Sequence, residues 1–409
     1  MVTSLGLIFL AGLAAGALAA RLGLPRLVGM LAAGIALGPY ALNLLDGTLL
    51  SVSAALRQMA LIVILLRAGL SLDPADLRRV GRPALLMAFV PACCEIAAFL
   101  LFAPPLLGLT RLEAAIMGAV VAAVSPAVVV PRMVQLMETR RGTAQGIPQL
   151  IMAGASCDDV FVIVLFSTFA RQAQGGGAGL GALAGVPVSI VLGALAGAGA
   201  GALLSLLFDA AHRRGCAIRG SIKLLLVLGT AFLLVAAEDW LAGIVPLAGL
   251  LAVIGMACAL RARCAAAVSR RLSDKLGKLW LAGEVVLFTL VGAAVDIRYT
   301  LHAGAAALGM LAAALVFRMA GVALCLLATP LRPRERLFCA LAYLPKATVQ
   351  AAIGAAPLAM GLPCGQLVLS VAVLAILTTA PLGALIIDRT APRQLTQAAE
   401  PPAPPRGAA

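Results

Sequence analysis

The stretch GASCDDVFVIVLF, residues Gly154 to Phe166, places two adjacent aspartates inside an apolar run. The run extends from about residue 147 to residue 170, long enough to cross a bilayer as one helix, with Asp158 and Asp159 near its middle. A carboxylate at that depth costs about 3 kcal/mol or more, and a like charge beside it adds to the cost. Such a pair is retained where a proton or a cation binds it. The stretch therefore favours a site at which protons and a small cation compete, over a polar pair buried only against other helices.

The composition indicates an all-α polytopic membrane protein. Of the 409 residues, 62% are hydrophobic and 12% are charged, which is more apolar surface than a soluble chain of this length can bury. The net charge of +14 does not indicate a nucleic-acid partner, because the basic residues lie in short loops between apolar runs. The nine cysteines lack a CxxC spacing and the two histidines lie in separate loops, so we expect no disulfide, resident metal or cofactor.

Thirteen apolar runs are candidate transmembrane helices. The first lacks a basic start, so we expect a retained helix, although the Ala-rich sequence after it is also typical of a signal peptide. The spans cover approximately residues 4–20, 26–42, 52–70, 83–105, 112–136, 146–170, 183–208, 221–237, 240–260, 279–295, 302–328, 336–361 and 366–387.

Basic residues divide the loops into two sets. One set of alternate loops, with the C-terminal tail, carries 24 Lys and Arg, the other set carries 3, and the remaining four lie within spans. Loops rich in Lys and Arg stay in the cytoplasm, so we expect an inner-membrane protein with its N-terminus outside and its C-terminus in the cytoplasm. One span too many or too few would destroy this alternation, which supports the odd count.

The first six and last six spans resemble each other in order. LVGMLAAGI (27–35) is similar to LAGLLAVIG (247–255), and spans in matching positions are interrupted at SPAVVVP (125–131) and LPKATVQAAIGAAP (344–357). A single linking span between the two halves inverts the second half. Inverted repeats with proline-interrupted spans at matching positions are typical of secondary transporters. We therefore predict two broken helices that cross.

Two segments lie outside the repeats. The linking span carries Gly193, Gly197 and Gly201 at four-residue spacing, which favours close helix packing, with a dimer contact as the alternative. Residues 261–278 are basic and amphipathic, and we expect them to form a helix on the cytoplasmic surface before the span at 279–295.

Several charged or interrupted positions fall near the middle of their spans. They are Glu95, the Ser125-Pro126 break, Asp158, Asp159, Arg318 and Lys346. Proline removes backbone hydrogen bonds, so the breaks leave carbonyls and helix ends free to face a buried ion. Glu95 and Arg318 are expected to form a structural salt bridge in preference to binding the ion, because arginine does not release its proton. Lys346 could release a proton or stay paired with Asp158, in which case only Asp159 would exchange.

Three motifs together resemble one known family. They are GASCDDVFVIVLFS (154–167), AAVSPAVVVP (122–131) and LPKATVQAAIG (344–354). In this combination they are similar to the NHA clade of monovalent cation/proton antiporters, relatives of the bacterial NhaA and NapA sodium/proton antiporters. The resemblance covers almost the whole chain, and it implies a homodimer whose subunits each have a scaffold domain and a mobile core domain.

The resemblance also implies roles for single residues. Asp158 and Asp159 correspond to the ion-binding aspartates, with Asp159 as the principal ligand, and Ser125 stands at the break that often offers a hydroxyl. Better-known bacterial members carry a lysine where this chain has Arg318, so the pair of Arg318 with Glu95 is more similar to the electroneutral branch. The full set of predicted site residues is Glu95, Ser125, Asp158, Asp159, Arg318 and Lys346.

The domains follow from the order of the spans and the resemblance. The predicted division is a scaffold at 1–82, a core at 83–170, a linker at 171–220, a scaffold at 221–300, a core at 301–388 and a disordered cytoplasmic tail at 389–409.

The predicted function is exchange of Na⁺ or Li⁺ for H⁺ by alternating access, with no enzymatic step; the bilayer and a second copy of the chain are the expected partners. A K⁺/H⁺ exchanger would have nearly the same sequence pattern. An organic-anion symporter could share the inverted repeat, but it would not need the acidic pair. An intramembrane aspartyl protease needs its two aspartates on separate helices, whereas adjacent residues point about 100° apart on one helix.

Overall fold

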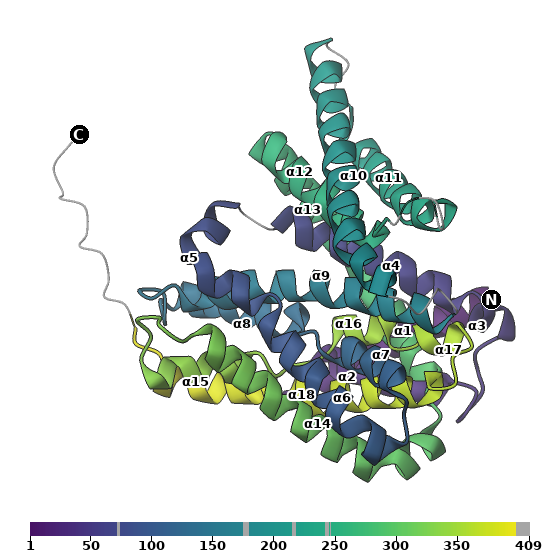
Figure 1. Ribbon diagram of the computed structural model, residues 1–409. Helices are drawn as coiled ribbons and strands as arrows, with labels where there is room; N and C mark the ends of the chain where they lie inside the picture. The colour runs from purple at the N-terminus through teal and green to yellow at the C-terminus, as the bar shows by residue number, and fades with distance from the viewer. Residues whose placement is uncertain (72–73, 175–179, 215–217, 242–244, 246, 398–409) are drawn as a thin grey trace.

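The computed structural model describes residues 1–71, 74–174, 180–214, 218–241, 245 and 247–397, and these residues form helices joined by short connections (Figure 1). Apart from one isolated bridge between Arg141 and Gln397, the described residues contain no β-structure. Ten helical segments in them are long and apolar enough to cross a membrane. The predicted all-α membrane fold is therefore confirmed, whereas the count of thirteen spans stays a prediction.

The helices follow the predicted spans in order. Those of the first half are α1 (Val2–Arg21), α2 (Arg26–Leu37), α3 (Gly47–Ser51), α4 (Ser53–Ser71), α5 (Pro74–Met87), α6 (Val90–Leu107), α7 (Arg111–Val121), α8 (Pro126–Glu138) and α9 (Ile147–Ala173). Those of the second half are α10 (Leu180–Arg213), α11 (Gly220–Trp240), α12 (Gly249–Arg263), α13 (Ala266–Ala293), α14 (Ile297–Cys325), α15 (Pro333–Ala342), α16 (Thr348–Ile353), α17 (Ala356–Ala359) and α18 (Gly365–Gln394).

Both predicted interruptions are present. The span at 112–136 is divided into α7 and α8, with Pro126 as the first residue of α8. The span at 336–361 is divided into α15, α16 and α17, and Pro345 lies in the connection between α15 and α16. Proline cannot donate the backbone hydrogen bond that would continue a helix, and the residue before it is driven out of the helical conformation.

The helices pack in two groups around α9. Helices α6, α7, α14 and α18 pack against one another, and α13 packs against α1, α2 and α4. Figure 1 shows α10, α11 and α12 at one side of the molecule and α14, α15 and α18 at the opposite side, with α9 between them. Helix α9 contacts α7 and α8 as well as α10 and α12, and its two aspartates are buried.

The glycine stripe of the linking span packs against α12. A Cβ added at Gly193, Gly197 or Gly201 would collide with a backbone carbonyl of α12, from Ala248, Ala252 or Met256 respectively. This close approach within one chain agrees with the prediction of tight helix packing, because only a residue without a side chain lets the two backbones come so near.

The basic segment at 261–278 differs from its prediction. Residues 266–278 do not form a surface helix of their own but are the first half of α13, which continues without interruption to Ala293. No proline divides the segment from the following span, and Leu272, Leu276 and Trp280 are buried at four-residue spacing. The apolar face of the segment therefore continues into the span, so the segment and the span form one long helix whose apolar face is buried along both.

The C-terminal region is also more ordered than predicted. Helix α18 extends to Gln394, six residues into the predicted disordered tail. Arg132 of α8 holds Asp388 through two nitrogen–oxygen contacts of 3.0 and 3.2 Å, and the Gly142 N–H donates to the Thr396 carbonyl. These contacts tie residues 389–397 to the connection between α8 and α9, while residues 398–409 lie outside the described part of the chain.

The α10–α12 contact gives a test of the packing. We expect Gly197→Ala to destabilise the protein by about 1–3 kcal/mol, because the new methyl group must push the Ala252 carbonyl aside. The matched control is Gly199→Ala on the same helix, where an added Cβ meets nothing within 4 Å. Thermal unfolding in detergent should show a lower Tm for Gly197→Ala only; equal Tm values would contradict the packing.

Candidate functional site

The two helix breaks meet each other at the centre of the molecule. The Ser125 N–H, at the start of α8, donates to the Pro345 carbonyl between α15 and α16 at 2.8 Å. Gln350 of α16 crosses in the other direction, and its Nε2 donates to the carbonyls of Val121 and Ala123 at 3.0 and 2.8 Å. Backbone groups released by one break are thus satisfied by the other, which is what a membrane interior requires. The predicted crossing of the two broken helices is confirmed.

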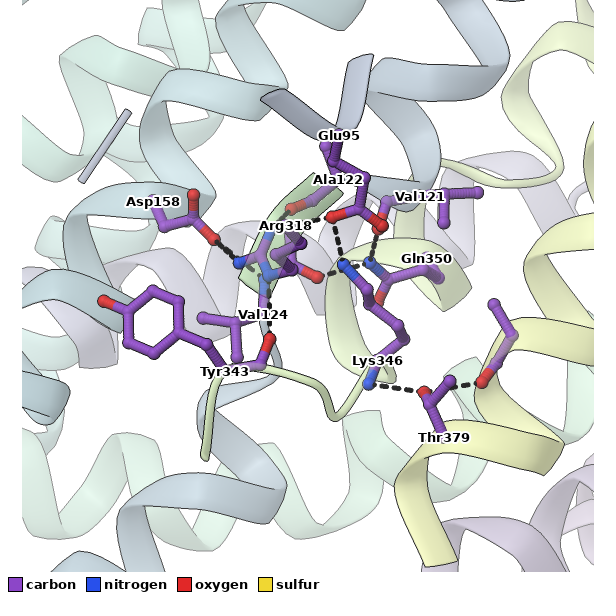
Figure 2. Close-up of polar contacts among 12 residues, drawn as sticks. Glu95, Val121, Ala122, Val124, Asp158, Arg318, Tyr343, Lys346, Gln350 and Thr379 are labelled. Atoms are coloured by element: carbon purple, nitrogen blue, oxygen red, sulfur yellow. Dashed lines mark hydrogen bonds and ion pairs between the residues drawn. The ribbon is translucent and has the colours of Figure 1, made fainter. Parts of the chain in front are cut away.

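Four buried charges surround this crossing. They are Glu95 on α6, Asp158 on α9, Arg318 on α14 and Lys346 in the connection between α15 and α16, and each is fully buried (Figure 2). The sequence places them in segments far apart, so the fold alone brings them together.

Arg318 is the centre of the cluster. Its Nη1 lies 2.8 Å from Glu95 Oε2, and its Nη2 lies 2.7 Å from Asp158 Oδ2. The same guanidinium donates to a carbonyl of each break, from Nε to Tyr343 at 2.7 Å and from Nη1 to Ala122. Arginine suits this position because its planar group offers five donors in fixed directions. The predicted Glu95–Arg318 salt bridge is confirmed, and Arg318 also holds Asp158.

Lys346 pairs with Glu95 and not with Asp158. Its Nζ lies 2.6 Å from Glu95 Oε2, so Glu95 receives both buried cations, whereas Asp158 receives Arg318. The pairing of Lys346 with Asp158 is therefore wrong. The break directs the lysine: its own N–H donates to Thr379 Oγ1 of α18 at 2.9 Å, which fixes the backbone from which the side chain extends towards α6.

The two adjacent aspartates have different surroundings. Asp158 Oδ2 accepts from Arg318 and from the Val124 N–H, the latter at 2.9 Å. Asp159 is 7% exposed, and its Oδ1 is buried without a hydrogen-bond partner among the described residues. On one helix the two side chains point about 100° apart. Asp158 Oδ1 also lacks a partner among the described residues, so the difference between the two aspartates is that Arg318 and Val124 already engage the other oxygen of Asp158.

Further oxygens without partners line the breaks. Ser125 Oγ and Thr348 Oγ1 are buried, and neither has a hydrogen-bond partner among the described residues. Each hydroxyl belongs to the first turn of a half-helix that begins at a break. Hydroxyl and carboxylate oxygens are ligands that hard monovalent and divalent cations accept. No group of three or more His, Cys, Asp and Glu residues suited to a resident metal is found in the described residues.

Sequence reasoning missed three residues of this region. Gln350 joins the breaks, Tyr343 supplies a carbonyl to Arg318, and Thr379 holds the Lys346 backbone. The signal for Gln350 was present, since it is an amide within an apolar half-helix one turn after Lys346. Gly154 also has a defined role: a Cβ there would collide with the buried Tyr343 hydroxyl, so the tyrosine can pack against α9 only beside a glycine.

A helical membrane protein with two broken helices that cross beside buried, paired charges is a secondary ion transporter. The sequence gives the family. Residues 5–391 match the family model described as sodium/hydrogen exchanger, transmembrane. The chain belongs to the sodium/hydrogen exchanger family, as the three motifs predicted, and this is a family of transporters and not of enzymes.

Relatives with known names agree with the family. The chain is 34% identical to sodium/hydrogen exchanger 9B2 of Mus musculus over 384 residues. This alignment covers 91% of this chain and 69% of that protein. The chain is 32% identical over 396 residues to sodium/hydrogen exchanger 9B1 of Homo sapiens, covering 92% and 74% respectively. The chain thus spans about two thirds to three quarters of the length of these relatives.

The fold is shared with a solved transporter. The sodium proton antiporter MjNhaP1 from Methanocaldococcus jannaschii, determined at pH 8, superposes with a TM-score of 0.83. The alignment covers 96% of this chain and 98% of that chain at 20% sequence identity. At this identity the likeness concerns the fold.

The double role of Glu95 gives a test of the cluster. Glu95→Gln leaves the buried Lys346 ammonium without its carboxylate, and stranding a buried charge costs about 3–5 kcal/mol. The double variant Glu95→Gln/Lys346→Gln removes the stranded charge, so in detergent it should unfold at a higher temperature than Glu95→Gln alone. Lys346→Gln alone completes the double-mutant cycle, and strictly additive effects would show that the two side chains do not interact.

Proposed function

We propose that this chain exchanges Na⁺, or Li⁺ in its place, for H⁺, and that Asp159 is the carboxylate for which the two ions compete. The observation that carries the proposal is the contrast between the two aspartates. Both aspartates have a buried Oδ1 without a partner among the described residues, but Asp158 Oδ2 is held by Arg318 and the Val124 N–H, whereas no ion pair joins Asp159 to a basic residue among them. The names of the relatives, all sodium/hydrogen exchangers, favour Na⁺ over K⁺ as the cation.

The formal charges explain why one ion must replace the other. Glu95 and Asp158 are balanced by Arg318 and Lys346. Asp159 then carries the one unbalanced charge of the cluster among the described residues. A proton or a monovalent cation on Asp159 brings the cluster to neutrality, and an empty site leaves a buried negative charge. Because an unpaired charge in the membrane interior is costly, the site crosses the membrane only when one of the two ions occupies it.

The cation would be held by oxygens of both aspartates and the first break. Asp159 is the principal ligand, and Ser125 offers a buried hydroxyl without a partner among the described residues. Besides the oxygen held by Arg318, Asp158 has Oδ1, which finds no partner in the part of the chain that the structure describes. Glu95, Arg318 and Lys346 position the site and balance its charge without binding the cation.

Transport follows from movement of one helix group against the other. We assign residues 83–170 and 301–388 to a mobile core, and residues 1–82 and 221–300 to a scaffold, with 171–220 as the linker. The unequal distribution of basic residues between alternate loops supports an inner-membrane orientation with the N-terminus outside. The functional unit is a homodimer in which the scaffolds meet.

One proton moves per cation in this scheme. Arg318 keeps its proton at any physiological pH and therefore keeps Asp158 ionised throughout the cycle. A Lys346–Asp158 pair would also have left Asp159 as the one exchanging group; the Arg318–Asp158 pair supports the same stoichiometry more strongly, since a guanidinium cannot serve as the second proton carrier.

Neutralising Asp159 tests the function directly. Asp159→Asn should abolish exchange without unfolding the protein, because the amide keeps the volume and loses the charge. Asp158→Asn should reduce the rate strongly but less completely, since it alters a counter-ion. The measurement is cation-induced dequenching of a pH-sensitive dye in proteoliposomes. Asp274→Asn, at an exposed position of α13, is the matched control and should exchange normally. A normal rate in Asp159→Asn would refute the assignment.

The stoichiometry is tested by voltage. In liposomes with a potential imposed by K⁺ and valinomycin, both the rate and the end-point of Na⁺/H⁺ exchange should be independent of that potential, because no net charge moves. If the end-point followed the imposed voltage, a second group, Lys346 or Asp158, would have to change its charge during the cycle.

A further inference from the structure

A second ion pair between helices lies away from the central cluster. Arg171, in the last turn of α9, donates from Nη2 to Glu238 Oε1 near the end of α11. The other oxygen of Glu238 accepts the Gly249 N–H at the start of α12, at 2.8 Å. The arginine side chain is 45% exposed and the glutamate side chain 18% exposed. The pair therefore sits at the rim of the molecule, where it ties the end of α9 to α11 and α12.

A stripe of residues on α9 leads from Asp159 towards Arg171. Asp159, Ile163, Ser167 and Arg171 follow at four-residue spacing, so each side chain neighbours the next, but each step advances about 40° and Arg171 lies about 120° around the helix axis from Asp159. At 1.5 Å per residue, Arg171 lies about 18 Å along the axis from Asp159. The stripe therefore winds from the site to the end of the helix where Arg171 meets Glu238.

A small cavity lies beside the part of this stripe beyond Asp159. It is lined by Ile163, Ser167, Arg171 and Glu238, together with residues of α10 and α12, and its volume is about 10 Å³, close to the room that one water molecule needs. Arg171 and Glu238 are the two charged residues of the lining. Ser167 returns its hydroxyl to the Ile163 carbonyl at 2.9 Å, and Ile163 itself is 2% exposed. The lining thus extends from Ile163, one helical turn from Asp159, to the Arg171–Glu238 ion pair at the rim.

We propose that Arg171 and Glu238 form a gate on the route by which the cation reaches Asp159 from the side of the membrane where α9 and α11 end. The proposal rests on the proposed function, in which α9 belongs to the mobile core up to residue 170, directly before Arg171, and Glu238 of α11 belongs to the scaffold. While the pair is closed, the guanidinium occupies the carboxylate that faces the cavity. Movement of α9 away from α11 breaks the pair, opens the cavity and frees the Glu238 carboxylate to attract a cation.

The exposure of the pair suits a gate. A partly exposed ion pair is weak, because water solvates both partners when they separate. The buried pairs of Arg318 have no such alternative. The peripheral contact can therefore break in every cycle while the central cluster stays assembled.

A matched ion pair elsewhere serves as a control. Arg132 and Asp388 also join two helices at the rim, but α8 and α18 both lie within the proposed core. Breaking that pair removes a comparable charge contact without releasing the core from the scaffold.

The test measures access to the cavity. In a background in which the nine native cysteines are replaced, Ile163→Cys is labelled with a small membrane-impermeant thiol reagent in right-side-out and everted vesicles. Arg171→Gln and Glu238→Gln should each raise the labelling rate at least tenfold, from one face only. Arg171→Lys and the exchanged pair Arg171→Glu/Glu238→Arg should keep it slow, and Arg132→Gln should leave it unchanged. Thermal unfolding of each variant checks that it is folded.

The outcomes separate the gate from the transported ion. Unchanged labelling in both neutral variants, or equal acceleration from both faces, would overturn the gate. The readout does not require exchange, so the inactive Asp159→Asn variant should show the same gated labelling. Gated labelling in a wild-type protein that fails to exchange Na⁺ for H⁺ would contradict the proposed function and leave the gate in place.

Discussion

The structure depends on the contacts that the Arg318 guanidinium makes in the membrane interior. The guanidinium binds Glu95 of α6, Asp158 of α9 and one backbone carbonyl from each helix break. A buried arginine is tolerated only where its donors and its charge are satisfied, so these four elements must meet around it. The cluster thereby fixes where the two broken helices cross, and through Asp158 it fixes the orientation of α9.

At this crossing the polar groups of the helix breaks and the buried polar and charged side chains satisfy each other's hydrogen bonds. The breaks release carbonyls and N–H groups that an unbroken helix would have satisfied, and lipid offers no substitute. Arg318, Gln350 and the Asp158 carboxylate take up several of these groups. In return, the charged side chains obtain polar partners that apolar helices could not provide. Two features that would each be unfavourable alone are favourable together.

The asymmetry of the aspartates follows from this arrangement. Arg318 holds Asp158, whereas Asp159 Oδ1 has no hydrogen-bond partner among the described residues, and Asp159 is the carboxylate to which we assign the transported ion in our proposal. An ion pair of the same chemical type, but weaker because it is partly exposed, lies at the rim of the molecule. Arg171 and Glu238 form an ion pair in partial contact with water, where it can open and close. The degree of burial thus distinguishes the Arg318 ion pairs, which hold the site together, from the Arg171–Glu238 pair, which we propose opens during transport.

The sequence by itself determined the membrane class, the order of the helices, both breaks and the identity of the buried charges. Apolar length, proline and the cost of a charge in lipid act locally, so they can be read along the chain. It also predicted that Glu95 meets Arg318. Only the tertiary structure decided that Lys346 pairs with Glu95 and not with Asp158, and that the basic segment before residue 279 is continuous with α13. The structure also decided two contacts between residues 67 or more positions apart, Arg171 with Glu238 and Gln350 with Val121. It likewise decided that Tyr343 binds Arg318 through its backbone carbonyl. Such partners depend on where several helices converge in space, and no local pattern of residues encodes that position.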